Sequence, residues 1–401
     1  MPVSQSKYWI WLAAQPSVSM RTKYRLLDTF SSPEEIFHAP VSQLRLRCGL
    51  TPAEEQALKG RTLDAAEDIL RRCREQGLSV LTVQDSSYPR RLHCTANPPM
   101  VLYVRGRLPD MDDEAAVAVI GTRGASSYGL DCAESMGREI VRHGGVLLTG
   151  LTRGIEAAAA EGALAEGGTV VAVLGTAHER ETGRLAQKVA ETGAVISEYA
   201  PGTAPLKAYF RERNRITSGL CVGTVVVEAP ENSGARGFVE EALRQGRDVF
   251  AVPGGINSPN SALCNSLIRE GATLAVNGWD VMSEYERQFP QKVRHAEERQ
   301  IAPEPMKAAE APEKPEKSEK PQPPSPKKPE PETLEKQLEG LSEIQLRIIG
   351  AMGRGAEHID DIVERTSLPA GAVLSQLTVL EIKGYIRREN GRKYALNVVK
   401  K

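Results

Sequence analysis

VAVIGTRGASSYGL (residues 117–130) is an apolar run that ends in a glycine turn and continues into a helix-like segment. β-branched residues followed by glycines predict a strand, a tight turn and a helix. The backbone N–H groups of such a turn, with the N-terminus of the next helix, favour an anion. The spacing of Gly121 and Gly124 differs from the G-x-G-x-x-G of dinucleotide sites, and the chain contains no G-x-x-x-x-G-K-[ST] motif. The turn therefore predicts another kind of phosphate site.

Similar strand–turn–helix units continue through residues 115–276. The runs VLLTG, TVVAVLG, AVISEYA, TVVVEA and DVFAVPG are continuously apolar, which is typical of parallel strands buried on both faces. Helical segments such as GFVEEALRQG lie between them. This alternation predicts an α/β fold with a doubly wound, Rossmann-like parallel sheet.

Composition divides the chain into four parts. Residues 1–75 have helical periodicity and start helices at Ser-Pro and Thr-Pro, which predicts a small helical domain of the SAM or helix-hairpin-helix kind. The α/β domain follows at 76–290. Residues 291–337 are rich in Pro, Lys and Glu and predict a disordered linker. In 338–401, three helical segments and a hairpin at Asn-Gly predict a winged helix.

The composition favours a cytoplasmic protein. No apolar run approaches the roughly 20 residues that cross a bilayer, so we expect no membrane span. The six cysteines are scattered, without a CxxC pair, which indicates reduced thiols rather than disulfides or a zinc site. We therefore expect no metal and no cofactor.

A basic segment, PLKAYFRERNRITSGL (residues 205–220), is the strongest indication of a ligand. Residues 101–290 hold 18 basic and 24 acidic side chains, so any polyanion must bind a local cluster. Here aromatic residues lie among cations, which suits single-stranded nucleic acid because cations contact phosphates and rings stack on bases. We expect a loop at the carboxyl edge of the sheet; the alternative is a solvated basic loop. The cations are Lys207, Arg211, Arg213 and Arg215.

A third loop, AVPGGINSPN (residues 251–260), is expected at the same edge. Gly254 and Gly255 can present backbone donors there, although an ordinary strand-to-helix connection is equally compatible with the pattern. Catalytic groups are hard to find: the histidines are dispersed and the serines lack a base. Glu228 suits a cap on a neighbouring loop better than an acid. Binding is favoured over catalysis, and we expect no enzyme.

Together these stretches resemble the DNA-processing protein A family (DprA, also called Smf). The resemblance rests on SSYPRRL, NPPMVLYVRG, VAVIGTRGASSYG, LLTGLTRGIEAAA, GGTVVAVLG, ISEYAPG, RNRI, VVVEA, GRDVFAVPG and NSLIREGA, which follow one another in order. It implies an extended Rossmann fold that forms homodimers through the Rossmann-like domain. It also implies a protein that binds and protects incoming single-stranded DNA and helps load RecA recombinase during natural transformation.

The resemblance assigns DNA contacts to Arg123, Lys207, Phe210, Arg213 and Asn214. The complete predicted site for single-stranded DNA comprises Gly121, Thr122, Arg123, Gly124, Ser126, Lys207, Phe210, Arg211, Arg213, Asn214, Arg215, Gly254 and Gly255.

Two other functions remain open from the residues. A nucleotide-processing or nucleotide-sensing protein related to phosphoribohydrolases would use a PGGxGTxxE stretch, of which PGGINSPN keeps only the first three residues. A transcription regulator would read bases with its winged helix, but PAGAVLSQLTVLEIKG has no Arg or Lys before Lys383. The segment GTAHERETGRLAQKV (residues 175–189) also departs from the family pattern.

Overall fold

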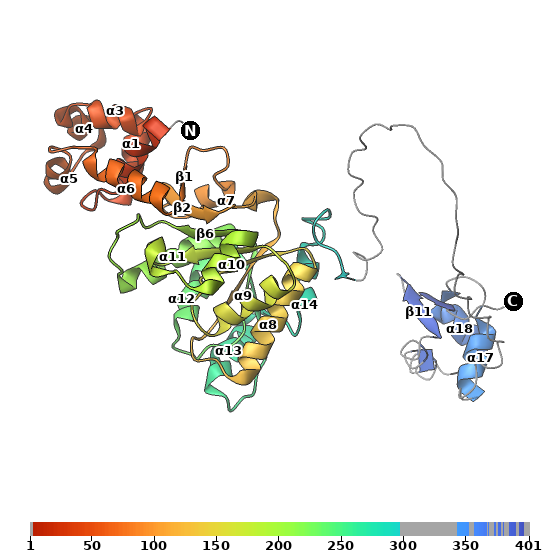
Figure 1. Cartoon of the computed structure of the whole chain (residues 1–401). Helices are drawn as coiled ribbons and strands as arrows, with labels where there is room; N and C mark the ends of the chain where they lie inside the picture. Colours follow the sequence, from red (N-terminus) through yellow and green to blue (C-terminus); the bar gives the residue numbers. More distant parts are fainter. Residues whose placement is uncertain are drawn as a thin grey trace, which may run out of the picture. The chain divides into compact units, whose positions relative to one another are not determined.

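The computed structural model forms two compact units, residues 1–306 and 307–401, which are described separately (Figure 1). A few single residues are also described between 367 and 384. The described ranges are 3–296, 343–352, 357–366, 385–389 and 393–396.

The first unit begins with a helical layer that confirms the predicted helix starts. Ser32 and Thr51 cap their helices by accepting the backbone N–H three residues on, each followed by proline at the first helical position. Trp9, Trp11 and Leu26 are buried in this layer. Its helices are α1 (Val3–Ala13), α2 (Met20–Thr29), α3 (Pro33–His38), α4 (Val41–Cys48), α5 (Pro52–Ala57) and α6 (Asp64–Glu75).

A nine-stranded sheet in the order β1-β2-β6-β5-β4-β3-β7-β8-β9 forms the centre of this unit. The seven strands β6-β5-β4-β3-β7-β8-β9 are parallel to one another, as predicted. The other two are antiparallel: β1 pairs with β2, and β2 pairs with β6. The strands are β1 (Ser79–Thr82), β2 (Val101–Gly106), β3 (Ala116–Ile120), β4 (Val146–Thr149), β5 (Val170–Leu174), β6 (Ala194–Ser197), β7 (Gly223–Val226), β8 (Asp248–Ala251) and β9 (Thr273–Leu274).

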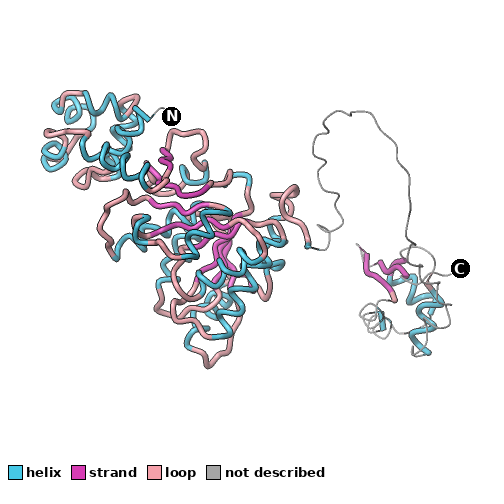
Figure 2. The backbone as a smooth tube through the Cα atoms, viewed as in Figure 1, coloured by secondary structure: helices cyan, strands magenta, loops and turns pink. Residues whose placement is uncertain are grey.

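Helices cover both faces of the sheet, which makes the fold Rossmann-like (Figure 2). One face packs against α8 (Ser127–Arg142), α9 (Ile155–Ala165), α10 (Arg184–Thr192) and α14 (Gly278–Met282). The other packs against α7 (Arg90–His93), α11 (Lys207–Leu220), α12 (Gly234–Arg244) and α13 (Ala262–Glu270). Short 3₁₀ turns are η1 (Met111–Asp113), η2 (His178–Arg180), η3 (Pro259–Ser261) and η4 (Ser283–Tyr285).

Glycines set the close packing of α8 on α9. A Cβ at Gly137 would lie 2.0 Å from the carbonyl oxygen of Ala159, and one at Gly162 would lie 2.0 Å from that of Glu134. Only glycine permits this approach. The two helices thus run side by side, with both N-termini at the carboxyl edge of the sheet.

The second unit contains α17 (Glu343–Ala351), β10 (Glu357–His358), α18 (Ile359–Thr366), β11 (Ile386–Glu389) and β12 (Lys393–Leu396). β11 and β12 pair antiparallel, with β10 on the other side of β12. The predicted turn at Asn390-Gly391 and most of the predicted recognition helix lie outside the described residues, as does nearly all of the predicted linker. The predicted domain boundaries stay predictions.

Candidate nucleic-acid interface

The loops that follow the parallel strands meet at the carboxyl edge of the sheet, here called the rim. The rim contains the glycine turn after β3, residues 150–154 after β4, Gly175 after β5, Glu228 after β7 and the loop 252–260 after β8. Ligands of open α/β sheets bind at this edge. The rim is therefore the place to test the predicted site residues.

The glycine turn is held by backbone contacts with Glu228, and its arginine is exposed. A Cβ at Gly121 would lie 2.6 Å from the carbonyl oxygen of Glu228, so the backbones touch here. Thr122 N donates to that same carbonyl over 2.7 Å, and Gly124 N donates to Thr122 Oγ1 over 3.2 Å. The side chain of Arg123 is left exposed at the tip of the turn. This geometry presents a cation without a flexible loop.

The carboxylate of Glu228 occupies the N-terminus of α8. It is buried and accepts hydrogen bonds from Ser126 N at 2.9 Å and Ser126 Oγ at 2.7 Å. Ser126 Oγ in turn accepts from Gly129 N, so Ser126 is the N-cap of α8, and the predicted capping role of Glu228 is confirmed. The same bonds mean that Ser126 is already engaged within the protein. Among the described residues, the amides of Arg123 and Ala125 make no hydrogen bond and stay available to an anion.

The predicted basic loop is wrong, because Lys207–Leu220 forms helix α11. Residues 207–220 contain no proline, and their one glycine lies in the last turn, so nothing interrupts the helix. A helix points its side chains in different directions, whereas a loop could have gathered them. Lys207 and Arg211 are exposed and Asn214 is half-buried, while Arg213 and Arg215 take other directions.

Phe210 and Arg123 come together at the rim, as the sequence predicted. The guanidinium carbon of Arg123 lies 5.4 Å from the centre of the Phe210 ring, which is cation–π distance. The half-buried ring rests on Gly175, where a Cβ would lie 2.9 Å from Phe210 Cδ1. A cation and an aromatic ring from distant parts of the chain thus share one surface.

Arg213 is buried, with 5% of its surface exposed, so its predicted direct contact with DNA is not supported. Its Nη1 donates to the carbonyl of Val173 at the end of β5 over 3.1 Å. Its Nη2 lies 3.7 Å from Glu156 Oε1 on α9, and a Cβ on Gly150 would overlap the guanidinium. Arg213 therefore ties α11 to two neighbouring rim segments from inside the protein.

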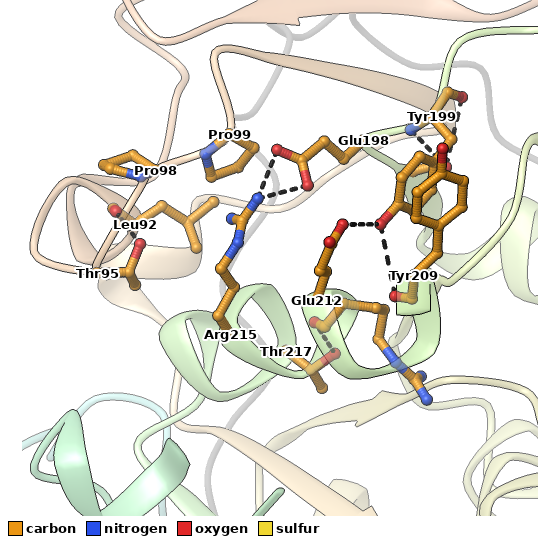
Figure 3. Close-up of polar contacts among 12 residues, drawn as sticks. Leu92, Thr95, Pro98, Pro99, Glu198, Tyr199, Tyr209, Glu212, Arg215 and Thr217 are labelled. Atoms are coloured by element: carbon orange, nitrogen blue, oxygen red, sulfur yellow. Dashed lines mark hydrogen bonds and ion pairs between the residues drawn. The ribbon is translucent and has the colours of Figure 1, made fainter. Parts of the chain in front are cut away.

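Arg215 is paired with a carboxylate inside the protein, which also argues against the predicted contact with DNA. Its Nη2 donates to both carboxylate oxygens of Glu198 at 2.5 Å (Figure 3). Nearby, Tyr199 donates to Glu212 and stacks on Tyr209 with ring centres 3.9 Å apart (Figure 3). These side chains line a cavity of about 970 Å³ between the N-terminal helices and α11.

The loop after β8 is attached to the glycine turn. Asn260 Nδ2 donates to the carbonyl of Gly124 over 3.1 Å. Gly254 exchanges two hydrogen bonds with the Asn265 side chain, so its amide is engaged. Gly255 is exposed. Of the two predicted glycines, Gly255 is therefore the one that is exposed to a ligand.

Arg153 is a rim cation that the sequence analysis missed. It is exposed in the loop after β4 and precedes Gly154, where a Cβ would lie 2.5 Å from the carbonyl oxygen of Thr122 and 2.9 Å from Arg123 Cα. Arg153 therefore lies beside the glycine turn. Its signal was a basic residue next to a glycine after an apolar strand, the same signal that identified Arg123.

The segment 175–189 folds as η2 followed by α10. His178 is fully buried and contacts the carbonyl of Tyr103 at 2.9 Å. Burial lowers the pKa of His178 to about 4, so the ring is neutral near pH 7. Among the described residues, no helix is long and apolar enough to cross a membrane, and no three acidic, Cys or His side chains are grouped as metal ligands.

The chain combines a Rossmann-like sheet with a winged helix, and helix-turn-helix modules of this kind are common in nucleic-acid-binding proteins. The family described as DNA recombination-mediator protein A matches residues 79–286, and the DprA winged helix domain matches residues 319–392. The chain belongs to the DprA/Smf family.

Individual relatives agree with this assignment. The DNA processing protein DprA of Streptococcus pneumoniae is 39% identical over 51% of this chain and 73% of its own length. A putative DprA of Mycobacterium tuberculosis is 30% identical over 83% of this chain and 80% of its own. The crystal structure of the S. pneumoniae protein superimposes with a TM-score of 0.61 and 30% identity, covering 69% of this chain and 97% of that one.

Proposed function

We propose that the rim binds single-stranded DNA, without catalysis, as part of the recombination-mediator role of the family. The observation that carries this proposal is the contact between Arg123 and Phe210. Single-stranded DNA needs a cation for its phosphates and an aromatic ring for its unpaired bases. The rim presents both on rigid supports.

The exposed cations around this contact suit the DNA backbone. Arg153 lies beside the turn, and Lys207 and Arg211 are exposed on α11. The domain is acidic overall, so we expect these exposed cations to attract the DNA backbone locally. We expect little sequence preference, because stacking and phosphate contacts are shared by all nucleotides.

Single strands should therefore compete better than duplexes. A labelled oligothymidine bound to the full-length protein should be displaced by unlabelled single strand at lower concentration than by duplex of equal length. Duplex bases are stacked inside the helix and cannot reach Phe210. Equal or stronger competition by the duplex would contradict the proposal.

The family role adds two partners, RecA recombinase and a second copy of this chain. We propose that the protein protects the single strand and helps to load RecA on it during natural transformation. A cytoplasmic location is consistent with this role. RecA filament formation on single strands, followed by DNA-dependent ATP hydrolysis, should start sooner when the protein is present.

The homodimer should use the free edge of the sheet at β9. Leu274 on β9 and Val276 just after it are 46% and 65% exposed, and β9 pairs only with β8 among the described strands. An exposed edge strand with apolar side chains is a template for another chain. Leu274→Glu combined with Val276→Glu should convert dimers to monomers in light scattering. Dimers that persist with the same dissociation constant would place the interface elsewhere.

A further inference from the structure

We infer that the single strand continues along the rim to a second stacking residue, Tyr128, beyond the glycine turn. The inference rests on the proposed function and extends it. Tyr128 lies in the first turn of α8, directly after the glycine turn, and 47% of its surface is exposed. An exposed tyrosine beside a phosphate-binding turn offers a ring face to an unpaired base.

The tyrosine ring is fixed rather than free to rotate into solvent. Its hydroxyl donates to the carbonyl of Pro253 at 2.7 Å, which anchors it to the loop after β8. That loop is itself joined to the glycine turn through Asn260 and Gly124. Ile256 in the same loop is 92% exposed and adds an apolar surface for a sugar or base. An anchored ring loses little entropy when a base stacks on it.

The order of strands places the two aromatic residues apart, with the cations between them. Phe210 lies over the end of β5, Arg153 follows β4, Arg123 follows β3, and Tyr128 is anchored to the loop after β8. In the order of the sheet, β5 and β8 are four places apart. One strand can thus contact both rings and the cations between them.

The length of the oligonucleotide separates this inference from the proposed function. With the full-length protein, Tyr128→Ala should weaken binding of a thymidine oligomer of about 12 nucleotides by about 5- to 140-fold. It should leave the affinity for an oligomer of about three nucleotides unchanged, because such a short oligomer reaches only Phe210 and Arg123. Phe210→Ala should weaken both. Tyr128→Phe, which keeps the ring, should bind the long oligomer nearly as the wild type does.

Leu130→Ala, an exposed apolar change on the same helix, is the matched control and should leave both affinities unchanged. A 2-aminopurine moved along the long oligomer should show two quenched positions, one lost in Tyr128→Ala and the other in Phe210→Ala. Unchanged long-oligomer binding by Tyr128→Ala, or one quenched position, would overturn the inference while leaving the proposed function intact. If Phe210→Ala instead binds both oligomers as tightly as the wild type does, the proposed function is rejected.

Discussion

Arg213→Ala should lower the free energy of unfolding by about 3 kcal/mol or more, because it leaves Glu156 buried without its cation. Glu156 keeps hydrogen bonds from Thr152 N and Oγ1, so we expect the lower end of the range for a broken buried pair. The corresponding fall in Tm is about 6–12 °C for a domain of this size. Differential scanning calorimetry of the full chain measures it directly.

The matched control is Arg211→Ala, two residues earlier on the same helix and exposed. It should change stability by no more than about 0.5 kcal/mol. The pair distinguishes an internal tie from a DNA contact. If Arg213→Ala melts like the wild type but binds single strands poorly, its side chain reaches the DNA, and our assignment to the interior is wrong.

Phe210→Ala should weaken binding to single-stranded DNA by about 1–3 kcal/mol. The ring supplies a stacking surface and supports the Arg123 guanidinium from 5.4 Å. Because the ring carries no charge, the dependence of affinity on salt should stay nearly the same. Fluorescence anisotropy at several salt concentrations measures both quantities.

Tyr209→Ala is the control for this change, since Tyr209 is the preceding residue but stacks on Tyr199 on the cavity side of α11. It should leave affinity for single strands nearly unchanged. The half-buried Phe210 ring also contacts Gly175, so melting must be measured in parallel. A Phe210→Ala variant that melts early and binds normally would make the ring structural.

Most of the fold, and the position of Arg123 and Phe210 at the rim, could be predicted from the sequence. Continuous apolar strands, helix caps and glycine turns are local signals, and each predicted an element that the structure contains. The sequence also predicted that Arg123 and Phe210 would lie at one edge of the sheet, although it assigned Phe210 to a loop and the structure places it on helix α11.

The directions of the remaining arginines could not be predicted in the same way. Reading residues 205–220 as a loop treated their cations as one cluster, whereas helix α11 turns successive side chains by about 100°. Arg213 and Arg215 then find carboxylates from distant segments, Glu156 and Glu198. Such pairs depend on tertiary packing, for which a single sequence gives no spacing rule.

The salt dependence of single-strand binding tests the central claim most directly. The logarithm of the association constant, plotted against the logarithm of salt concentration, has a slope that reports the phosphates neutralised. Arg123→Ala should reduce this slope by about 0.7, the amount expected for one lost phosphate contact on a single strand. Arg244→Ala, an exposed cation at the end of α12 and thus at the opposite edge of the sheet, should leave the slope unchanged. An unchanged slope in Arg123→Ala would contradict the claim that the glycine turn holds the DNA backbone.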